Sequence, residues 1–376
     1  MLYQDLGPYS DWVAGAKAAH ALFPSLPPGT TARRIVRQVL DFSIGDEKPQ
    51  APTIDAQWQT PRVIGEEISW SVGYGPRTRA WLLRPRHAPG RRLPAIVALH
   101  DHGGFKYYGK EKIADGPGGP APFLQAFRRV FYGGRAYANA LAEQGFVVLV
   151  PDVFLWGSRR FPLSAMPLWI RAKALQHHRK TFPVTRAAIR RYNQAAAEHE
   201  HVVEKYCTLL GTTLAAMVSY EDRVAVNYLC SRDDVAAQRI GCVGLSGGGC
   251  RAALLQATCN HIHATVIVGM MSRYQPMVDT HVKYHTWMFW PPGLSRVGDW
   301  PDLAGCRAPS PLMVQYASRD ELFPLSGMRA AHQVLRQHYR SAEAARNYVG
   351  RFFPVPHCFD LRMQALAFAW LRSHLG

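Results

Sequence analysis

The 376-residue sequence predicts an α/β fold in which helices cover both faces of a mostly parallel sheet. Continuous apolar runs such as residues 95–99 are typical of strands that are buried on both faces of a parallel sheet. These runs alternate along the chain with segments of helical periodicity, which favours strand–helix–strand units. A chain of this length can bury about three quarters of its unfolded surface, which is enough for one large core.

The first 60 residues are predicted to form a helical extension. It contains two helical patterns, separated by Pro27-Pro28, and then a linker that contains Pro and Gln. The patterns and the linker cover residues 11–22, 31–40 and 48–61. The chain therefore divides into an extension over 1–60 and a main α/β domain over 61–376.

An alternating pattern at the start of the main domain predicts a hairpin, with strands 67–72 and 78–83, at the antiparallel edge of the sheet. Predicted strands and helices then alternate. The strands are 95–99, 146–150, 240–245, 264–269, 312–317 and 348–353; the helices are 136–144, one around 214–228, 249–258, 326–339 and 360–374. A basic helical insertion that contains aromatic residues interrupts this alternation at about 153–205.

The net charge of +17 comes mainly from arginine, because 35 of the 44 basic residues are Arg and nine are Lys. The arginines are spread along the chain without a long basic run, which favours a solvated surface over a nucleic-acid site. A hydrophobic content of 48% with 19% charged residues excludes a disordered or fibrous chain.

Targeting signals are absent from the sequence pattern. No stretch approaches 18 uninterrupted apolar residues, and the first residues have neither the basic nor the apolar region of a secretory signal. The seven cysteines are scattered without a Cys-x-x-Cys pair, which argues against a disulfide framework or a thiolate zinc site. We expect a cytoplasmic protein.

The sharpest motif is Gly-x-Ser-x-Gly over residues 244–248, which lies between a buried strand and a helix. In this strand–turn–helix context a strained turn presents a nucleophilic serine above the sheet, which predicts that role for Ser246. The alternative is a glycine-rich turn whose serine caps the helix. A serine also needs a base and a group that orients the base.

The two partners are expected on loops after later strands, in the order serine, acid, histidine. Asp320 follows the second strand after Ser246, and His357 follows the last strand. Alternatively, Asp320 is a surface turn residue and His357 a packed or helix-capping residue. Glu321 leaves the same strand as Asp320, but successive side chains of an extended segment point in opposite directions.

Acyl transfer further needs donors for the developing oxyanion. One is expected to be the backbone N–H of Gly247. The other is expected from the loop after strand 95–99, at His102, or at Gly103 or Gly104 if the turn is shifted.

From about residue 60 onward the chain resembles the α/β-hydrolase superfamily, in particular the bacterial dienelactone-hydrolase-like and acetylxylan-esterase-like branch. The resemblance is carried by residues 99–104 with 108–111, 234–241, 244–249 and 320–324. Asp101 stands where the branch commonly has Gly, and Ala236 where it commonly has Asp. The resemblance implies ester hydrolysis through an acyl-enzyme but does not imply one substrate.

The sequence thus predicts a serine carboxylic-ester hydrolase that requires no cofactor and no metal. The His-x-His pairs at 199–201 and 261–263 do not match a zinc site, because an i, i+2 spacing on a helix points the rings apart. The insertion and the loop 271–300 are expected to form the substrate pocket, with the aromatic residues Trp169, Tyr284, Trp287, Phe289 and Trp290.

Two other readings remain open. The same triad serves a lactonase, an amidase or a carbon–carbon hydrolase, because fold and triad do not fix the bond cleaved. The alternative outside the enzymes is a non-catalytic protein that binds polyanions through its basic surface. As partners we expect a small-molecule or polymeric ester, with no nucleic acid and no membrane; a homo-oligomer is compatible with the sequence.

Overall fold

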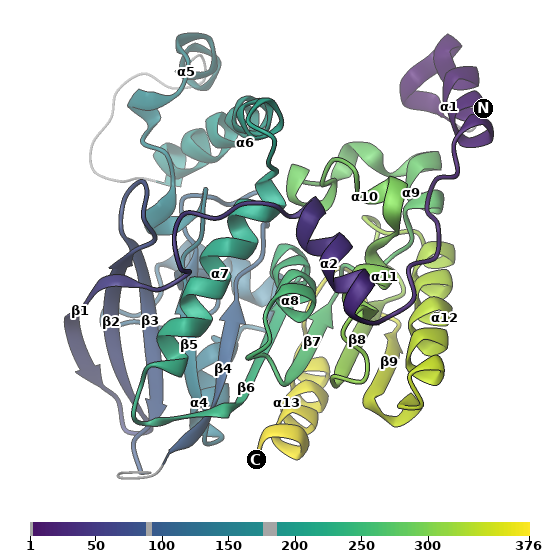
Figure 1. Cartoon of the computed structure of the whole chain (residues 1–376). Helices are drawn as coiled ribbons and strands as arrows, with labels where there is room; N and C mark the ends of the chain where they lie inside the picture. Colours follow the sequence, from purple (N-terminus) through teal and green to yellow (C-terminus); the bar gives the residue numbers. More distant parts are fainter. Residues whose placement is uncertain (1–2, 88–91, 176–185) are drawn as a thin grey trace.

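The computed structural model describes residues 3–87, 92–175 and 186–376 and confirms the predicted α/β architecture (Figure 1). Nine strands form one sheet in the order β1-β2-β3-β5-β4-β6-β7-β8-β9. The strands are β1 (Gln50–Gln59), β2 (Val63–Ser71), β3 (Thr78–Pro85), β4 (Leu93–Leu99), β5 (Val147–Pro151), β6 (Val235–Leu245), β7 (Ala264–Val268), β8 (Leu312–Ala317) and β9 (Tyr348–Phe353).

The sheet is antiparallel at one edge and parallel elsewhere. Strands β1, β2, β3 and β5 pair antiparallel, whereas β5, β4, β6, β7, β8 and β9 pair parallel. The predicted hairpin is β2–β3, but β1 and not β2 is the edge strand. The sequence analysis took residues 48–61 for a linker because nearly all of β1 is exposed on both faces, so no apolar alternation marks it as a strand.

Helices lie on both faces of the sheet (Figure 1). They are α1 (Ser10–Ala19), α2 (Thr30–Val39), α3 (Pro122–Phe131), α4 (Tyr137–Glu143), α5 (Leu168–Leu175), α6 (Arg186–Leu209), α7 (Leu214–Cys230), α8 (Gly247–Thr258), α9 (Tyr274–Thr280), α10 (Leu294–Val297), α11 (Trp300–Gly305), α12 (Leu325–Ser341) and α13 (Leu361–Leu375). One core joins the sheet to α2, α7, α8 and α11, and another joins it to α4 and α13.

Strand β4 shows how the apolar pattern produces two cores. Residues 95–99 are completely buried, as the continuous apolar run predicts. Val97 and Leu99 belong to the core on one face, and Ile96 and Ala98 to the core on the other. Successive side chains of a strand point to opposite faces, so a strand covered on both faces is apolar throughout.

The insertion contributes α5 and α6, which stand apart from the sheet in Figure 1. A small separate cluster ties them together through Met166, Ile170 and Tyr192. The long helix α6 then leads into α7. The middle of the insertion thus has a small cluster of its own, whereas residues 153–156 and 203 at its two ends belong to the core of the sheet.

The N-terminal extension packs unevenly. Helix α2 buries Ala32 and Val36 against the core, whereas α1 buries no residue and is held by an ion pair between Lys17 and Asp279, at 2.8 Å. The division at residue 60 stays a prediction, although β1 already belongs to the sheet.

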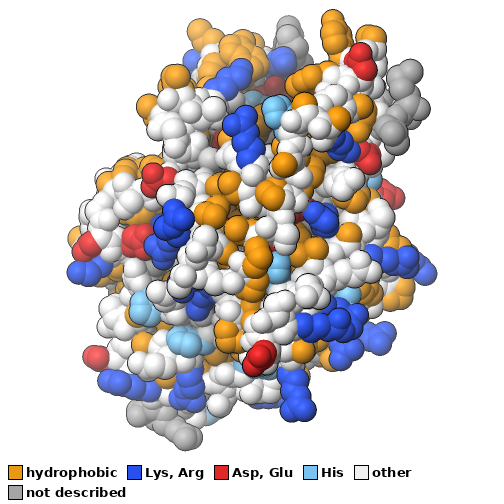
Figure 2. All heavy atoms as spheres, turned by 45° about the vertical axis from the view of Figure 1, so that its right-hand side comes forward, with side chains coloured by type: hydrophobic (Ala, Val, Ile, Leu, Met, Phe, Trp, Pro, Cys, Tyr) orange, Lys and Arg blue, Asp and Glu red, His pale blue; other side chains and the backbone are white. Residues whose placement is uncertain are grey.

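Lys and Arg side chains are dispersed over the face that Figure 2 shows. All seven cysteines are free. Among the helices of the described ranges, none combines the length and apolar character that crossing a membrane requires.

The junction of α6 and α7 contains a buried carboxyl group that makes stability depend on pH. Glu204 accepts a hydrogen bond from the Leu214 N–H at 3.0 Å, and burial raises the pKa of Glu204 to about 7. The unfolded chain releases this proton near pH 4.3, so folding stability falls as the pH rises from there through about 7.

Replacing Glu204 by glutamine is therefore expected to raise the melting temperature relative to the unchanged protein at pH 8.5 but much less at pH 5. The amide oxygen still accepts the Leu214 N–H, while no charge is buried at high pH. Thermal unfolding of both proteins at the two pH values measures the difference. An equal difference at both would show that the carboxyl group does not titrate in this range.

Candidate active site

Ser246 occupies a strained turn between β6 and α8. Its backbone has φ 58° and ψ −119°, a region that residues other than glycine rarely adopt. Hydrogen bonds from Ser246 N to Val268 O and from Cys250 N to Ser246 O, both 2.8 Å, hold it there. A Cβ at Gly244 would lie 2.4 Å from the backbone of Gly248, so only glycine allows the helix to start this close to the strand.

His357 and Asp320 meet across two neighbouring strands. His357 follows β9 and Asp320 follows β8, and the His357 Nδ1 lies 2.5 Å from the Asp320 Oδ2. The other oxygen of Asp320 accepts the Leu322 N–H at 2.9 Å. The Asp320 carboxylate is fully buried, while Glu321 is exposed. The imidazole is thus oriented by a carboxylate that is itself fixed.

The loop after β4 brings a second backbone amide close to Gly247. A Cβ at Gly247 would lie 2.6 Å from the backbone nitrogen of His102, so the two residues are neighbours. The Gly104 N–H donates to the His102 Nδ1 at 3.0 Å. That amide is therefore already engaged, which favours His102 or Gly103 over Gly104 as an oxyanion donor.

Asp101, which departs from the related branch, is buried within this loop. Its Oδ1 accepts a hydrogen bond from the Tyr132 hydroxyl at 2.5 Å, and Lys112 pairs with its Oδ2 at 3.4 Å. The carboxylate is thus a buried brace of the loop, fixed by a phenol and an ammonium.

Glu200 of the insertion links three walls of the site. Its Oε2 contacts the ammonium of Lys106 and lies 3.2 Å from the His102 Nε2. Its Oε1 accepts hydrogen bonds from the Thr286 hydroxyl at 2.6 Å and the Trp287 N–H at 2.9 Å. Burial alone would raise the pKa of Glu200, but Lys106 and His102 hold that pKa well below its usual range.

These hydrogen bonds fix the tautomer of His102. Its Nδ1 accepts the Gly104 N–H, so its Nε2 carries the proton and donates to Glu200. The sequence analysis missed Glu200, because its partners lie about 90 residues away in both directions and no local pattern marks it.

One cavity of about 380 Å³ unites these groups. Its lining includes Ser246, Gly247, His357, His102, Gly103, Gly104 and Glu200. Among the described residues, no hydrogen bond joins Ser246 and His357. Apo structures often show this contact loosened, and both side chains face the same space.

The predicted pocket aromatics fall into two groups. Tyr284, Trp287 and Phe289 line the cavity. Trp290 stacks on Tyr274 next to it, with the ring centres 5.1 Å apart. Trp169 lies on α5 with 53% of its surface exposed and is not among the residues that line this cavity.

His285 also lines the cavity and was not foreseen. Its Nε2 lies 2.9 Å from the Leu322 carbonyl oxygen, which makes that nitrogen a donor. Burial lowers the pKa of His285 to about 4, so it stays neutral near pH 7.

In the His-x-His segment 199–201, both rings contact aromatic side chains. The His201 Nδ1 accepts the indole N–H of Trp287 at 2.7 Å, and His199 packs edge-on against Phe161. Within residues 3–87, 92–175 and 186–376, no group of three His, Cys, Asp or Glu side chains is arranged to hold a metal ion.

The fold is that of the α/β-hydrolases. The chain belongs to the dienelactone hydrolase family, whose model matches residues 133–359, more than half of its length. It is therefore an enzyme of the hydrolase class.

Individual relatives are distant. The chain is 23% identical over 286 residues to the Bacillus subtilis (strain 168) protein "Putative hydrolase YtaP", covering 76% of this chain and 79% of that protein. A glucuronoyl esterase from Solibacter usitatus shares the fold with a TM-score of 0.62 and 12% identity, covering 94% of this chain and 98% of the other. Acetyl xylan esterase 1 from Thermoanaerobacterium sp. has a TM-score of 0.58 and 12% identity, covering 96% and 98%.

Proposed function

We propose that this enzyme is a serine carboxylic-ester hydrolase that works through a Ser246–His357–Asp320 triad and an acyl-enzyme. The observation that carries the proposal is the 2.5 Å contact of His357 with a buried carboxylate, at the wall of the cavity that Ser246 also lines. Esterase neighbours of the same fold agree with this choice of bond.

In this mechanism Asp320 holds the proton on Nδ1 of His357, which leaves Nε2 free to act as the base. The Ser246 hydroxyl attacks the ester carbonyl carbon and transfers its proton to Nε2. The N–H groups of Gly247 and of His102 or Gly103 stabilise the oxyanion. The imidazolium then protonates the leaving alcohol, and a water molecule, deprotonated by His357, releases the acid.

The experiment that tests the proposal is a panel of p-nitrophenyl esters and lactones, run beside a fluorophosphonate label. Ester turnover with the label on Ser246 supports the proposal. Turnover of lactones alone would favour the lactonase alternative. The absence of both turnover and labelling would refute a serine esterase. A cytoplasmic location, the absence of nucleic-acid partners and any assembly of copies stay predictions.

We further propose that Glu200 is a positioning residue for the oxyanion donors. It orients His102, whose ring in turn accepts the Gly104 N–H, and it fixes Trp287 on the opposite wall. Glutamine at this position keeps the shape of the side chain, but only one of its two terminal atoms is an oxygen, so it cannot accept hydrogen bonds on both sides as the carboxylate does.

Glu200→Gln is expected to lower kcat for a p-nitrophenyl ester about tenfold or more while changing KM less than threefold. Oxyanion donors act on the transition state rather than on bound substrate, and loss of one donor costs about 10²–10³ in kcat. Glu198→Gln, an exposed site on the same helix, is the matched control. A change confined to KM, or equal effects of the two variants, would contradict the positioning role.

A further inference from the structure

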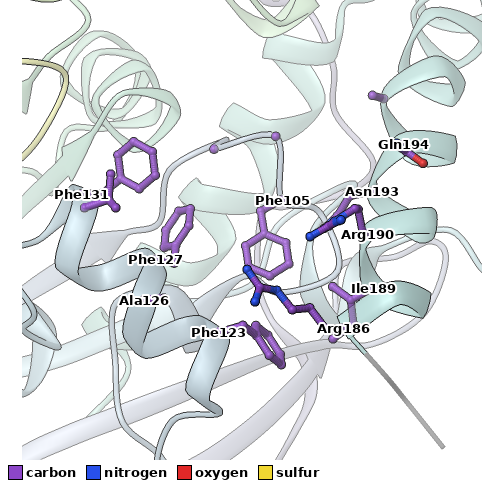
Figure 3. Close-up of a pocket in the computed structure, with 14 residues that line it drawn as sticks. Phe105, Phe123, Ala126, Phe127, Phe131, Arg186, Ile189, Arg190, Asn193 and Gln194 are labelled. Carbon is purple, nitrogen blue, oxygen red and sulfur yellow. The ribbon is translucent and has the colours of Figure 1, made fainter.

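A second groove, of about 590 Å³, borders the active-site cavity (Figure 3). The two hollows share Gly103, Gly104, Phe131 and Ala197 in their linings. A Cβ at Gly104 would meet no atom within 4 Å, so this glycine leaves open space where the hollows meet. A ligand anchored at Ser246 can therefore extend into the groove over the oxyanion loop, which is the segment 100–105 after β4.

One wall of the groove is aromatic. Phe123, Phe127 and Phe131 of α3 line it together with Phe105 of the oxyanion loop. The ring centres of Phe105 and Phe127 are 5.6 Å apart, and those of Phe127 and Phe131 are 4.7 Å apart, so the rings form a continuous surface. A flat aromatic ligand gains both apolar burial and ring–ring contacts on such a wall.

The opposite wall carries two arginines from α6. Arg186 and Arg190 are one helical turn apart and both line the groove. In Figure 3 the Arg186 side chain extends toward Phe105 and Phe123. Neither guanidinium has an ion-pair partner among the described residues, and the adjoining sequence 176–185 contains no Asp or Glu. Two cations beside an aromatic wall match a ring with an acidic substituent, since guanidinium binds carboxylates in two-pronged fashion.

We propose that this groove binds the aromatic part of the ester substrate and that Arg186 and Arg190 bind an acidic substituent on its ring. The inference rests on the proposed esterase function and narrows it to esters that contain an aromatic carboxylate. The sequence analysis placed the pocket on the insertion and on the loop 271–300, and did not include α3.

Two series of esters test this assignment on the acyl and the alcohol side. The acyl series consists of methyl butanoate, methyl benzoate and monomethyl terephthalate. The alcohol series consists of ethyl acetate, phenyl acetate and 4-acetoxybenzoate. In at least one series we expect kcat/KM to be about tenfold or more higher for the carboxylated aromatic ester than for the aliphatic one. The absence of this preference in both series would overturn the inference.

Paired variants assign the preference to the groove. Ala126→Trp fills the groove and is expected to reduce the aromatic-over-aliphatic ratio at least fivefold, whereas Gln125→Trp, on the exposed side of α3, keeps it. The double variant Arg186→Gln/Arg190→Gln is expected to remove the preference for the carboxylated ring. Its control, Arg129→Gln/Lys205→Gln, removes two exposed charges that do not line the groove. Equal ratios in variant and control would place the preference elsewhere.

Binding without turnover separates this inference from the proposed function. Calorimetric titration with terephthalate is expected to show binding to the unchanged enzyme that weakens about tenfold in the double arginine variant and not in its control. If no ester is turned over but this binding pattern holds, the esterase proposal fails and the groove assignment stands. If esters are turned over but terephthalate binds all variants alike, or none, the groove assignment fails alone.

Discussion

Ser246→Ala is expected to abolish ester turnover, lowering kcat by far more than a hundredfold, without unfolding the protein. Loss of a triad nucleophile typically costs about a millionfold. Alanine keeps the Cβ and hence the backbone preference of serine, so the strained turn at φ 58° is not made worse. The side chain lies in a cavity rather than in a packed core, so its hydroxyl fills no essential space.

The measurement compares kcat and melting temperature for this variant and for Ser326→Ala. Ser326 is an exposed serine in the first turn of α12 and does not line the cavity. The control should retain full turnover and fluorophosphonate labelling, and the Ser246 variant neither. More than about a hundredth of normal turnover with Ser246→Ala would mean that another group is the nucleophile.

The pattern of apolar residues along the chain was sufficient to predict the parallel part of the sheet. Strands β4, β5, β7 and β8 and the second half of β6 are buried and read as short apolar runs, whereas β9 is only partly buried; all six strands are confirmed. In such a sheet the loops after neighbouring strands share one edge, so the order of the strands already predicted that residues 246, 320 and 357 would be near one another. The contact between His357 and Asp320 agrees with that expectation.

The features that the sequence could not predict depend on contacts between distant residues or lie on exposed elements. Strand β1 lacks a buried face and so lacks a pattern. Glu200 reads as one polar residue of an amphipathic helix, and only the fold shows that it is buried against Lys106, His102 and Trp287. Trp169 was chosen because aromatic residues favour pockets, yet a side chain on the outer helix of an insertion is largely exposed.

The second large effect on kcat is expected at the acid of the triad, for which Asp320 and Glu321 are the two adjacent candidates. Asp320→Asn is expected to lower kcat by about four orders of magnitude, because an amide cannot hold the proton on His357 Nδ1 and the wrong tautomer then faces the serine. Glu321→Gln should change kcat less than about tenfold, since Glu321 is exposed and Asp320 already occupies the imidazole nitrogen. Both variants are compared at one pH with the same p-nitrophenyl ester. The reverse ranking would assign the acid to Glu321. If both variants had mild effects, the acid would lie on another strand and His357 would not be the base, because removing the charge of a fully buried carboxylate 2.5 Å from the catalytic base must lower kcat.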